Sequence, residues 1–353
     1  MRHKFSLGSS IAISTLSIII SSTALAAVPA DKFDFKNWKI TLPMDANNDG
    51  KIDEVDVSKI QTFQHDDYFY LDESNDNIVF VAPNKAQTTS GSSNTRSELR
   101  QMLRGTNTSV GTHSRDNNFA IKANKRAKKF ASIGGQLTAV LKVDHVAVNA
   151  GHPDKKPAFS VVVGQIHAGK DQGIVNNGKG FGWGNEPIKI YYKKLPNHDK
   201  GSVFWTYERN LPKDDPNRTD IAFPVWGNTW DNLEDPGEAG IALGEYFSYA
   251  ILVHENMMYV KFVANGRDSV MYKVDLSNNV DPNGNVDELD HPQGYSQDWF
   301  YFKAGAYNQC STKNSEHYWY TACPGTGDWE TDKKNGDYTQ VSFSKLELKS
   351  IKK

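Results

Sequence analysis

Short β-rich segments, broken repeatedly by Asn, Asp, Gly and Pro, constrain the fold of this chain most, because long helical periodicity is almost absent. The stretches between them, such as 171–185 and 231–240, are rich in Gly, Asn and charge, which is typical of surface loops. No internal repeat and no Pro-rich or Ser/Gly-rich linker divides the chain. The pattern therefore predicts an all-β fold, a jelly-roll β-sandwich of two antiparallel sheets, with one or two helical turns near 57–63. The expected strands are 77–82, 136–148, 159–167, 188–192, 203–207, 246–254, 258–263, 269–274, 299–304 and 339–348.

The beginning of the chain has the composition of an export signal. Residues 2–4 are basic, 11–20 are apolar but too few to cross a bilayer, and the small residues at 24–26 form a cleavage site. We therefore expect residues 1–26 to be a signal peptide and 27–353 to be a single catalytic domain. The mature protein would be secreted or periplasmic, with no membrane segment.

The charge balance excludes one class of partner. The whole chain has 40 Lys+Arg against 42 Asp+Glu, and the expected mature chain has a net charge of −4, whereas dedicated nucleic-acid binders are strongly basic. An aromatic content of 11% indicates a sizeable core. We expect a monomer that binds no nucleic acid.

The two cysteines of the chain, Cys310 and Cys323, are 13 positions apart. In an exported protein this pair predicts a disulfide, which would stabilise the fold by about 3 kcal/mol in the chain-entropy model. The alternative is a metal pair, but no second Cys pair and no His pair at ligand spacing accompanies it.

Three segments place polar residues at alternate positions, so that these residues share one face of a strand. Taken singly, each segment is more typical of a solvated sheet face than of a functional site. In 96–100, the apolar Leu99 turns to the opposite face, as does Ile166 in 165–167. The residues that share a face are Arg96, Glu98 and Arg100 in the first segment, Gln165 and His167 in the second, and Tyr301, Lys303, Tyr307 and Gln309 in the third.

Together the three segments resemble the motifs of polysaccharide lyase family seven, the alginate lyases. That family has an Arg-Ser/Thr-Glu-Leu-Arg strand, a Gln-Ile/Val-His strand and a Tyr-Phe-Lys-Ala-Gly-x-Tyr-Asn-Gln strand, and 96–100, 165–167 and 301–309 match them in the same order. Segments 35–43 and 341–348 fit the ends of the family, so the resemblance covers nearly all of the mature chain. It implies a concave substrate cleft on the jelly roll and endolytic β-elimination of alginate to unsaturated uronate oligosaccharides.

The resemblance also implies a catalytic set, which the side-chain chemistry supports. β-Elimination requires a uronate carboxylate to be neutralised, which a forked cation (Arg96) and an amide (Gln165) can do. His167 would accept the C5 proton, and Tyr307 would protonate the leaving oxygen. No cofactor is required by this chemistry. The residues expected to form the substrate-binding group are Arg100, Lys303, Glu98 and Gln309, with Glu98 orienting the two arginines, while Lys189 and Lys193 are candidates to add positive charge.

The segment 45–56 resembles the start of a calcium-binding loop, with the pattern Asp-x-Asn-x-Asp-Gly. It departs from that loop by carrying an Asp at its last position, where a bidentate Glu is expected, and by lacking a clear entering helix. An Asn/Asp-rich turn is the alternative. The candidate calcium ligands are Asp45, Asn47, Asp49, Lys51 and Asp56.

Two other functions remain to be compared with elimination. A jelly-roll hydrolase would need two carboxylates on one cleft face, and no Glu-x-Asp-x-x-Glu strand pattern is present. A non-catalytic carbohydrate-binding module could use Trp183, Trp205, Trp226 or Trp230 as sugar platforms, although tryptophans are more often core residues. Within the family, Ile at position 166 is associated with acceptance of guluronate, so we expect guluronate-containing blocks to be preferred.

Overall fold

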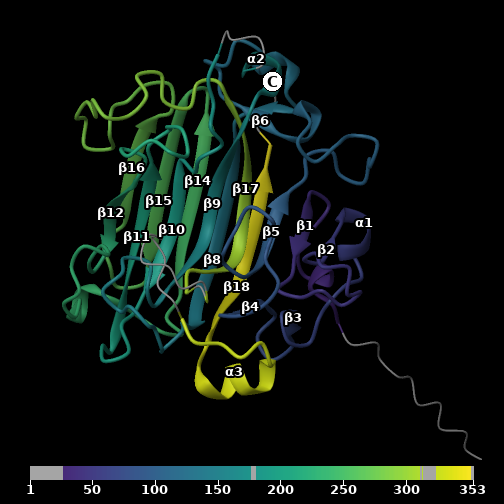
Figure 1. Ribbon diagram of the computed structural model, residues 1–353, viewed down its shortest axis with the longest axis vertical. Coiled ribbons are helices and arrows are strands. Elements are labelled where there is room, and N and C mark those ends of the chain that lie inside the picture. Colours follow the sequence, from purple (N-terminus) through teal and green to yellow (C-terminus); the bar gives the residue numbers. More distant parts are fainter. Residues whose placement is uncertain (1–26, 176–179, 311, 313–322, 351–353) are drawn as a thin grey trace, which may run out of the picture.

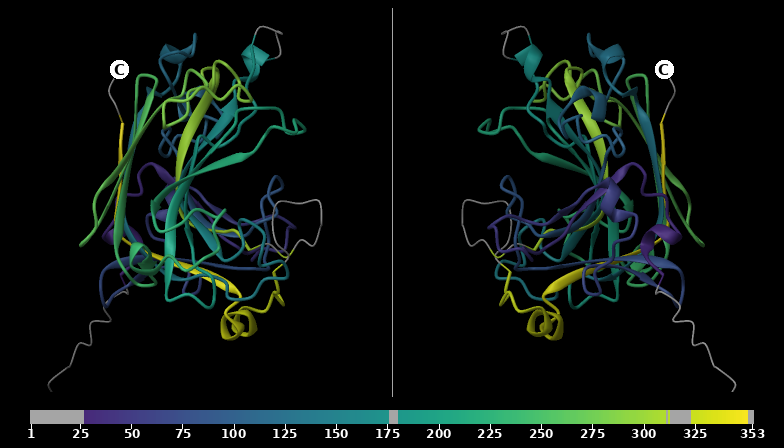
Figure 2. Two further views of the ribbon diagram at one scale, coloured as in Figure 1. Left: turned by 90° about the vertical axis from the view of Figure 1, so that its left-hand side faces the viewer. Right: turned by 90° about the vertical axis from the view of Figure 1, so that its right-hand side faces the viewer.

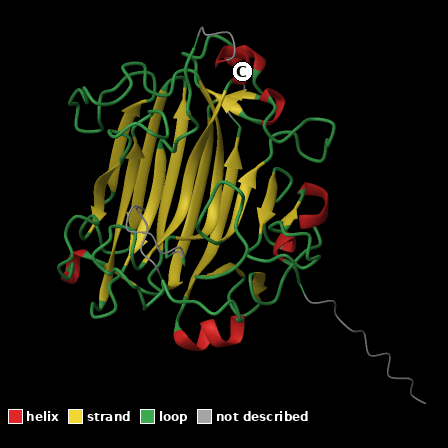
Figure 3. Ribbon diagram, viewed as in Figure 1, coloured by secondary structure: helices red, strands yellow, loops and turns green. Residues whose placement is uncertain are grey.

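The computed structural model describes residues 27–175, 180–310, 312 and 323–350, and this part of the chain is mostly β (Figure 3). The predicted signal peptide, 1–26, lies outside the described residues. The helices are short and lie at the periphery of the sheets (Figure 1). They are α1 (Val57–Ile60), α2 (Gln172–Val175), α3 (Trp329–Asn335), and the 3-10 helices η1 (Pro29–Asp31), η2 (Arg115–Asn117), η3 (Ala127–Lys129) and η4 (Gly237–Ala239).

The strands of the described residues form two sheets that stack as layers (Figure 2), which confirms the predicted antiparallel sandwich. Every pairing along the main path of each sheet is antiparallel, and only the short β6 and β7 pair in parallel. The first sheet runs β12 (Asp220–Trp226), β11 (Lys200–Glu208), β10 (Ile188–Lys193), β9 (Ser160–Lys170), β17 (Asp298–Asn308), β5 (Arg96–Gln101), β1 (Trp38–Thr41), β2 (Glu54–Val55), with β13 (Ile241–Ala242), β6 (Phe119–Ala120) and β7 (Ser132–Ile133) attached. The second runs β16 (Val270–Asp275), β15 (Met257–Ala264), β14 (Phe247–His254), β8 (Gly135–His145), β18 (Tyr338–Lys349), β4 (Asn77–Pro83), β3 (Phe69–Asp72).

All ten strands listed from the sequence overlap strands of the structure, whereas β12, α3 and several short strands such as β3 were not predicted. β12 contains Pro224, which weakens a strand signal because proline cannot donate to a ladder. The proline is tolerated because β12 is the edge of its sheet. The helical turn predicted near 57–63 is α1.

The two sheets differ in how they meet water. In β14 of the second sheet, buried and more exposed residues alternate, as in a sheet with one solvated face. In β5 and β10 of the first sheet, every residue is buried, so side chains cover both faces. This burial argues against a simple solvated face for the motif strands.

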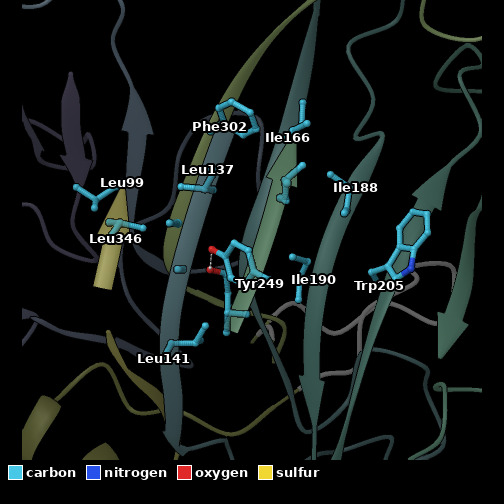
Figure 4. Close-up of a cluster of buried hydrophobic side chains, with 14 of the residues drawn as sticks. Leu99, Leu137, Leu141, Ile166, Ile188, Ile190, Trp205, Tyr249, Phe302 and Leu346 are labelled. Atoms are coloured by element: carbon cyan, nitrogen blue, oxygen red, sulfur yellow. Dashed lines mark hydrogen bonds between the residues drawn. The ribbon is translucent and has the colours of Figure 1, made fainter. Parts of the chain in front are cut away.

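The core between the sheets fixes which way the motif strands face. Leu99 of β5, Ile166 of β9 and Phe302 of β17 are fully buried in the main hydrophobic cluster (Figure 4). Side chains alternate across a strand, so the neighbours of these residues point to the opposite face of the sheet. The inward orientation predicted for Leu99 and Ile166 is confirmed.

A bulge in β17 changes the register along the motif strand. The pairing of β17 with β9 shifts between Ala304 and Tyr307, and Gly305 between them has φ +140°. A Cβ atom on Gly305 would lie 2.5 Å from the carbonyl oxygen of Ser97, so no larger residue fits without moving β5. Bulges redirect side chains, and this one sets the direction of Tyr307.

Candidate active site

A polar row crosses the first sheet on the face opposite the core. Neighbouring strands lie about 4.8 Å apart, so a row across six strands spans about 24 Å. The cross-strand partners in this row are Lys39, Arg100, Lys303, Gln165, Lys189 and Thr206. The three sequence motifs therefore meet on one face, on the adjacent strands β5, β17 and β9 (Figure 1).

Glu98 is the centre of what we call the Glu98 cluster, made of Arg96, Glu98, Gln165 and Lys303. Its carboxylate pairs with Arg96 Nη1 at 3.0 Å, accepts from Gln165 Nε2, and pairs with Lys303 Nζ. Burial alone would raise the pKa of Glu98, but Lys303 and Arg96 outweigh it and the pKa is lowered. Burial, followed by the charge of Arg96, lowers the pKa of Lys303 to about 8.

Arg100 corrects part of the sequence prediction. Its Nη1 donates to the carbonyl of Gln101 at 2.7 Å, and its Nη2 donates to the carbonyl of Thr112 at 3.0 Å and to Asn118 Oδ1 at 2.9 Å. Its guanidinium carbon lies 3.9 Å from the centroid of the Tyr301 ring. Both terminal nitrogens of Arg100 therefore have acceptors within the protein, and its contact with a substrate carboxylate stays a prediction. Glu98 accordingly orients one arginine and Lys303, not two arginines.

Tyr307 stands beside Arg96 at one side of the Glu98 cluster. The Arg96 guanidinium carbon lies 4.0 Å from the ring centroid, and Ser92 Oγ lies 3.2 Å from the Tyr307 hydroxyl and 2.9 Å from Arg96 Nη2. Sequence reasoning missed Ser92, because it lies in a Ser/Gly-rich loop without periodicity. Gln309 is buried, and its amide donates to the carbonyl of Tyr307 at 3.3 Å, so it supports the strand, while its contact with substrate stays a prediction.

His167 lies two residues beyond Gln165 on β9, with its side chain 32% exposed. Its ring stacks on Tyr301, with centroids 5.2 Å apart and planes 10° apart. Its Nδ1 lies 2.6 Å from the carbonyl oxygen of Ala168, and its Nε2 lies 3.0 Å from Glu186 Oε1. A cavity of about 740 Å³ opens beside His167, and other residues that line it are Tyr301, Trp299, His113, Arg115 and Lys170.

A second group of charges, the Glu186 cluster, lies next to His167 at the ends of β10, β11 and β12. Lys189 Nζ is 2.9 Å from Asp220 Oδ2, 3.5 Å from Glu186 Oε2 and 3.7 Å from Glu208 Oε2. Arg218 Nη2 is 2.5 Å from Glu208 Oε1 and completes the cluster.

The two glutamates of this cluster have pKa values shifted in opposite directions. Burial would raise the pKa of Glu186, but His167 and then Lys189 outweigh it, and the pKa lies well below its usual range. Burial raises the pKa of Glu208 well above its usual range, against the pull of Lys189 and with a contribution from Glu186. Glu186 is therefore the carboxylate that keeps its charge beside the imidazole.

Both lysines proposed to add positive charge to the cleft, Lys189 and Lys193, are bound by protein groups. Lys189 is surrounded by the three carboxyl groups of the Glu186 cluster. Lys193 donates to the carbonyls of Lys156 and Ala158, and burial lowers its pKa to about 8. Beside Glu98, positive charge comes from Arg96 and Lys303.

The calcium prediction needs correction at its last ligand. Asp45 accepts hydrogen bonds from the backbone of Asp49 and Gly50, and Asp49 accepts from the backbone of Lys51, as in an Asx-rich turn. Asp56 instead caps α1 and pairs with Arg104 at 2.8 Å. Within the described residues, no group of three or more His, Cys, Asp or Glu could hold a metal ion. The remaining residues named as ligands, Asn47 and Lys51, belong to the same turn.

The disulfide prediction is confirmed, because Cys310 and Cys323 are bonded, with their Cα atoms 5.5 Å apart. The tryptophans weighed as sugar platforms are mostly core residues: Trp205, Trp226 and Trp230 are 0%, 7% and 2% exposed. Across the described residues, no helix is long and apolar enough to cross a membrane.

A jelly roll whose sheet carries a buried arginine–lysine–amide cluster, flanked by an imidazole and a phenol, has the groups that a polysaccharide lyase requires. The alginate lyase family model matches residues 33–350 of this chain. An alginate lyase of Klebsiella pneumoniae is 34% identical over 309 residues, covering 85% of this chain and 90% of that protein. The chain belongs to the alginate lyases of polysaccharide lyase family 7, and its activity is β-elimination of alginate.

Solved structures agree with this assignment. The crystal structure of the alginate lyase from Klebsiella pneumoniae has a TM-score of 0.69 at 31% identity, covering 92% of this chain and 99% of that chain. The exolytic PL7 alginate lyase AlyA5 from Zobellia galactanivorans has a TM-score of 0.70 at 32% identity, covering 90% and 96%. The family 7 alginate lyase A1-II′, at 20% identity and a TM-score of 0.55, supports the fold alone.

Proposed function

We propose that this lyase cleaves alginate within the chain, prefers guluronate-containing blocks, and uses Arg96, Gln165, His167 and Tyr307 as its catalytic set. The Glu98 cluster is the observation that carries the proposal. It gathers two cations and an amide beside Tyr307, with His167 two residues further along β9. Arg96 Nε is buried without a hydrogen-bond partner among the described residues, so the guanidinium keeps one donor that no described protein group uses.

The elimination follows from these groups. Arg96, Gln165 and Lys303 would stabilise the negative charge that grows on the uronate carboxylate. His167 would accept the C5 proton, and the electron pair of the C5–H bond would form the new C4–C5 double bond. The C4–O bond then breaks, and the leaving oxygen takes the hydroxyl hydrogen of Tyr307. Arg96, stacked on the Tyr307 ring, would stabilise the tyrosinate that remains.

The extent of the polar row supports cleavage within a chain, because about 24 Å along the sheet exceeds the length of one sugar ring. The buried side chain of Ile166, between Gln165 and His167, supports the guluronate preference through the placement of its two neighbours. The C5 hydrogen lies on opposite ring faces in the two epimers, and a shift of about 1 Å can change a rate by about 100-fold. We further propose a monomer that is secreted or periplasmic, in keeping with its disulfide, and that needs no cofactor.

The test follows ultraviolet absorbance of the conjugated product during digestion of alginate. His167→Ala and Tyr307→Phe are expected to keep the fold and lose about 10²- to 10⁴-fold in turnover. Turnover like that of the unchanged enzyme in either variant would remove that residue from the set.

Products from purified polyguluronate and polymannuronate test the mode and the preference. We expect a ladder of oligomers early in the reaction, and faster cleavage of polyguluronate. Monomer or dimer as the sole early product would instead indicate the exolytic mode named for the Zobellia galactanivorans enzyme. Ile166→Val is expected to lower the preference ratio, and an unchanged ratio would remove the explanation based on residue 166.

A further inference from the structure

Both ring nitrogens of His167 have a partner in the structure. Nδ1 lies 2.6 Å from the carbonyl oxygen of Ala168. Nε2 lies 3.0 Å from Glu186 Oε1. These two contacts fix the orientation of the imidazole ring.

We propose that Glu186 is the positioning residue of His167. Its carboxylate holds the imidazole ring through Nε2, in the orientation in which His167 acts as a base. The inference rests on the role proposed for His167.

The surroundings hold Glu186 in place for this task. Its backbone N–H donates to Glu208 Oε2 at 3.0 Å, and the backbone N–H of Glu208 donates to its carbonyl at 3.2 Å. Lys189 lies 3.5 Å from its second carboxylate oxygen. These contacts come from β10 and β11, while Tyr301 of β17 supports the other side of the His167 ring. Sites supported by strands hold geometry better than sites on loops.

Three variants at position 186 separate the charge from the shape of the side chain. Glu186→Gln keeps the size and an oxygen for Nε2 but removes the negative charge that holds the ring, and we expect kcat to fall about 10- to 100-fold with KM within about threefold. Glu186→Asp keeps the carboxylate, and should recover most of the kcat that Gln loses. Glu186→Ala should be at least as slow as Gln. Glu255→Gln is a matched control for the same change of side chain. Glu255 lies on the turn between β14 and β15 of the second sheet, and its exposed carboxylate pairs with Lys122.

A double variant identifies the route of the effect. If Glu186 acts through His167, then His167→Ala with Glu186→Gln should be as active as His167→Ala alone. A Gln variant within threefold of the unchanged kcat, or a further full loss in the double variant, would overturn the inference. Should Glu186→Gln fail to fold, as judged by circular dichroism, the comparison of Asp with Ala in both backgrounds decides the question. Full activity of His167→Ala would contradict the role of His167 and the inference with it, whereas a slow His167→Ala beside a fully active Glu186→Gln would contradict the role of Glu186 alone.

Discussion

The Glu98 cluster and the Glu186 cluster lie on the same sheet, yet their charges are opposite in balance. The first places one carboxylate between two cations, Arg96 and Lys303. The second places three carboxyl groups around two cations, Lys189 and Arg218. An excess of cations suits a uronate carboxylate, whereas an excess of acids suits a protonated imidazole. The two halves of the proposed reaction therefore use buried ion groups of opposite sign.

The strand pattern alone does not distinguish these clusters, because it predicts the face of a strand residue but not the residues that neighbouring strands and loops bring beside it. What differs is the neighbouring strand. Glu98 lies next to β17, which brings Lys303, while Glu208 pairs with Asp220 across β11 and β12. Loss of the central residue should therefore lower the unfolding free energy in both clusters, with a different pH dependence in each.

Glu98→Gln should have the largest effect. It leaves Arg96 and Lys303 buried without their carboxylate, and breaking a buried ion group costs about 3–5 kcal/mol of unfolding free energy. We also expect turnover to fall about 100-fold, because both cations lose their positions. Urea unfolding and initial rates measure the two effects, with Glu255→Gln as control.

The pH dependence of Glu98→Gln gives a further check. Lys303 has a folded pKa of about 8 against an ordinary value of 10.5, and the loss of Glu98 should lower it further. Between these values the unfolded chain binds more protons, so the stability of the variant should rise with pH. Because Lys303 of the unchanged enzyme titrates near 8, the stability difference between the two proteins should shrink as the pH rises to about 8 and stay constant above it. A difference that does not shrink in this range would contradict this assignment.

Lys189→Met should cost slightly less, about 3 kcal/mol at neutral pH, because the carboxyl groups left behind can take up protons. The pKa of Glu208 is already raised by burial, and the folded variant should bind more protons than the unfolded chain. The loss of unfolding free energy in Lys189→Met, relative to the unchanged enzyme, should therefore shrink as the pH falls toward 5. Glu98→Gln should show the opposite pH dependence. Parallel pH profiles of stability for the two variants would show that the clusters do not differ as described.

Lys303→Arg should have the smallest effect, visible in KM at alkaline pH. As the pH rises through about 8, Lys303 loses its proton and its attraction for an anionic chain, so KM of the unchanged enzyme should rise about threefold. Arginine stays charged throughout, so the variant should show a flatter KM profile between pH 7 and 9.5. An identical rise in both enzymes would place the titrating group elsewhere.

Much of this arrangement could be predicted from the sequence, because it depends on alternation along single strands. The shared face of Arg96 and Glu98 and the inward Leu99 and Ile166 are of this kind. The Cys310–Cys323 bond could be predicted because the chain has only two cysteines. What could not be predicted depends on which strands are neighbours. Glu186 precedes β10 in a stretch without periodicity, and its contacts with Glu208 exist only because β10 and β11 pair.

The partners of long side chains could not be predicted from the sequence either. The face of Arg100 was predicted, yet its guanidinium turns to Thr112 and Asn118 in a loop that shows no regular pattern. Asp56, read as a metal ligand from its spacing, pairs with Arg104 instead. A sequence pattern gives the side of a strand from which such a residue leaves, but not the partner it reaches.

Gly305 shows where this enzyme has little freedom to change. With a hydrogen in place of a side chain, β17 lies against the Ser97 carbonyl, and a methyl group there would separate two strands that carry Arg96, Glu98, Lys303 and Tyr307. A saturation-mutagenesis survey would therefore rank Gly305 with the reacting residues, although it has no reactive group. Attempts to evolve a wider cleft or a new uronate preference should leave this position fixed and vary the surrounding loops.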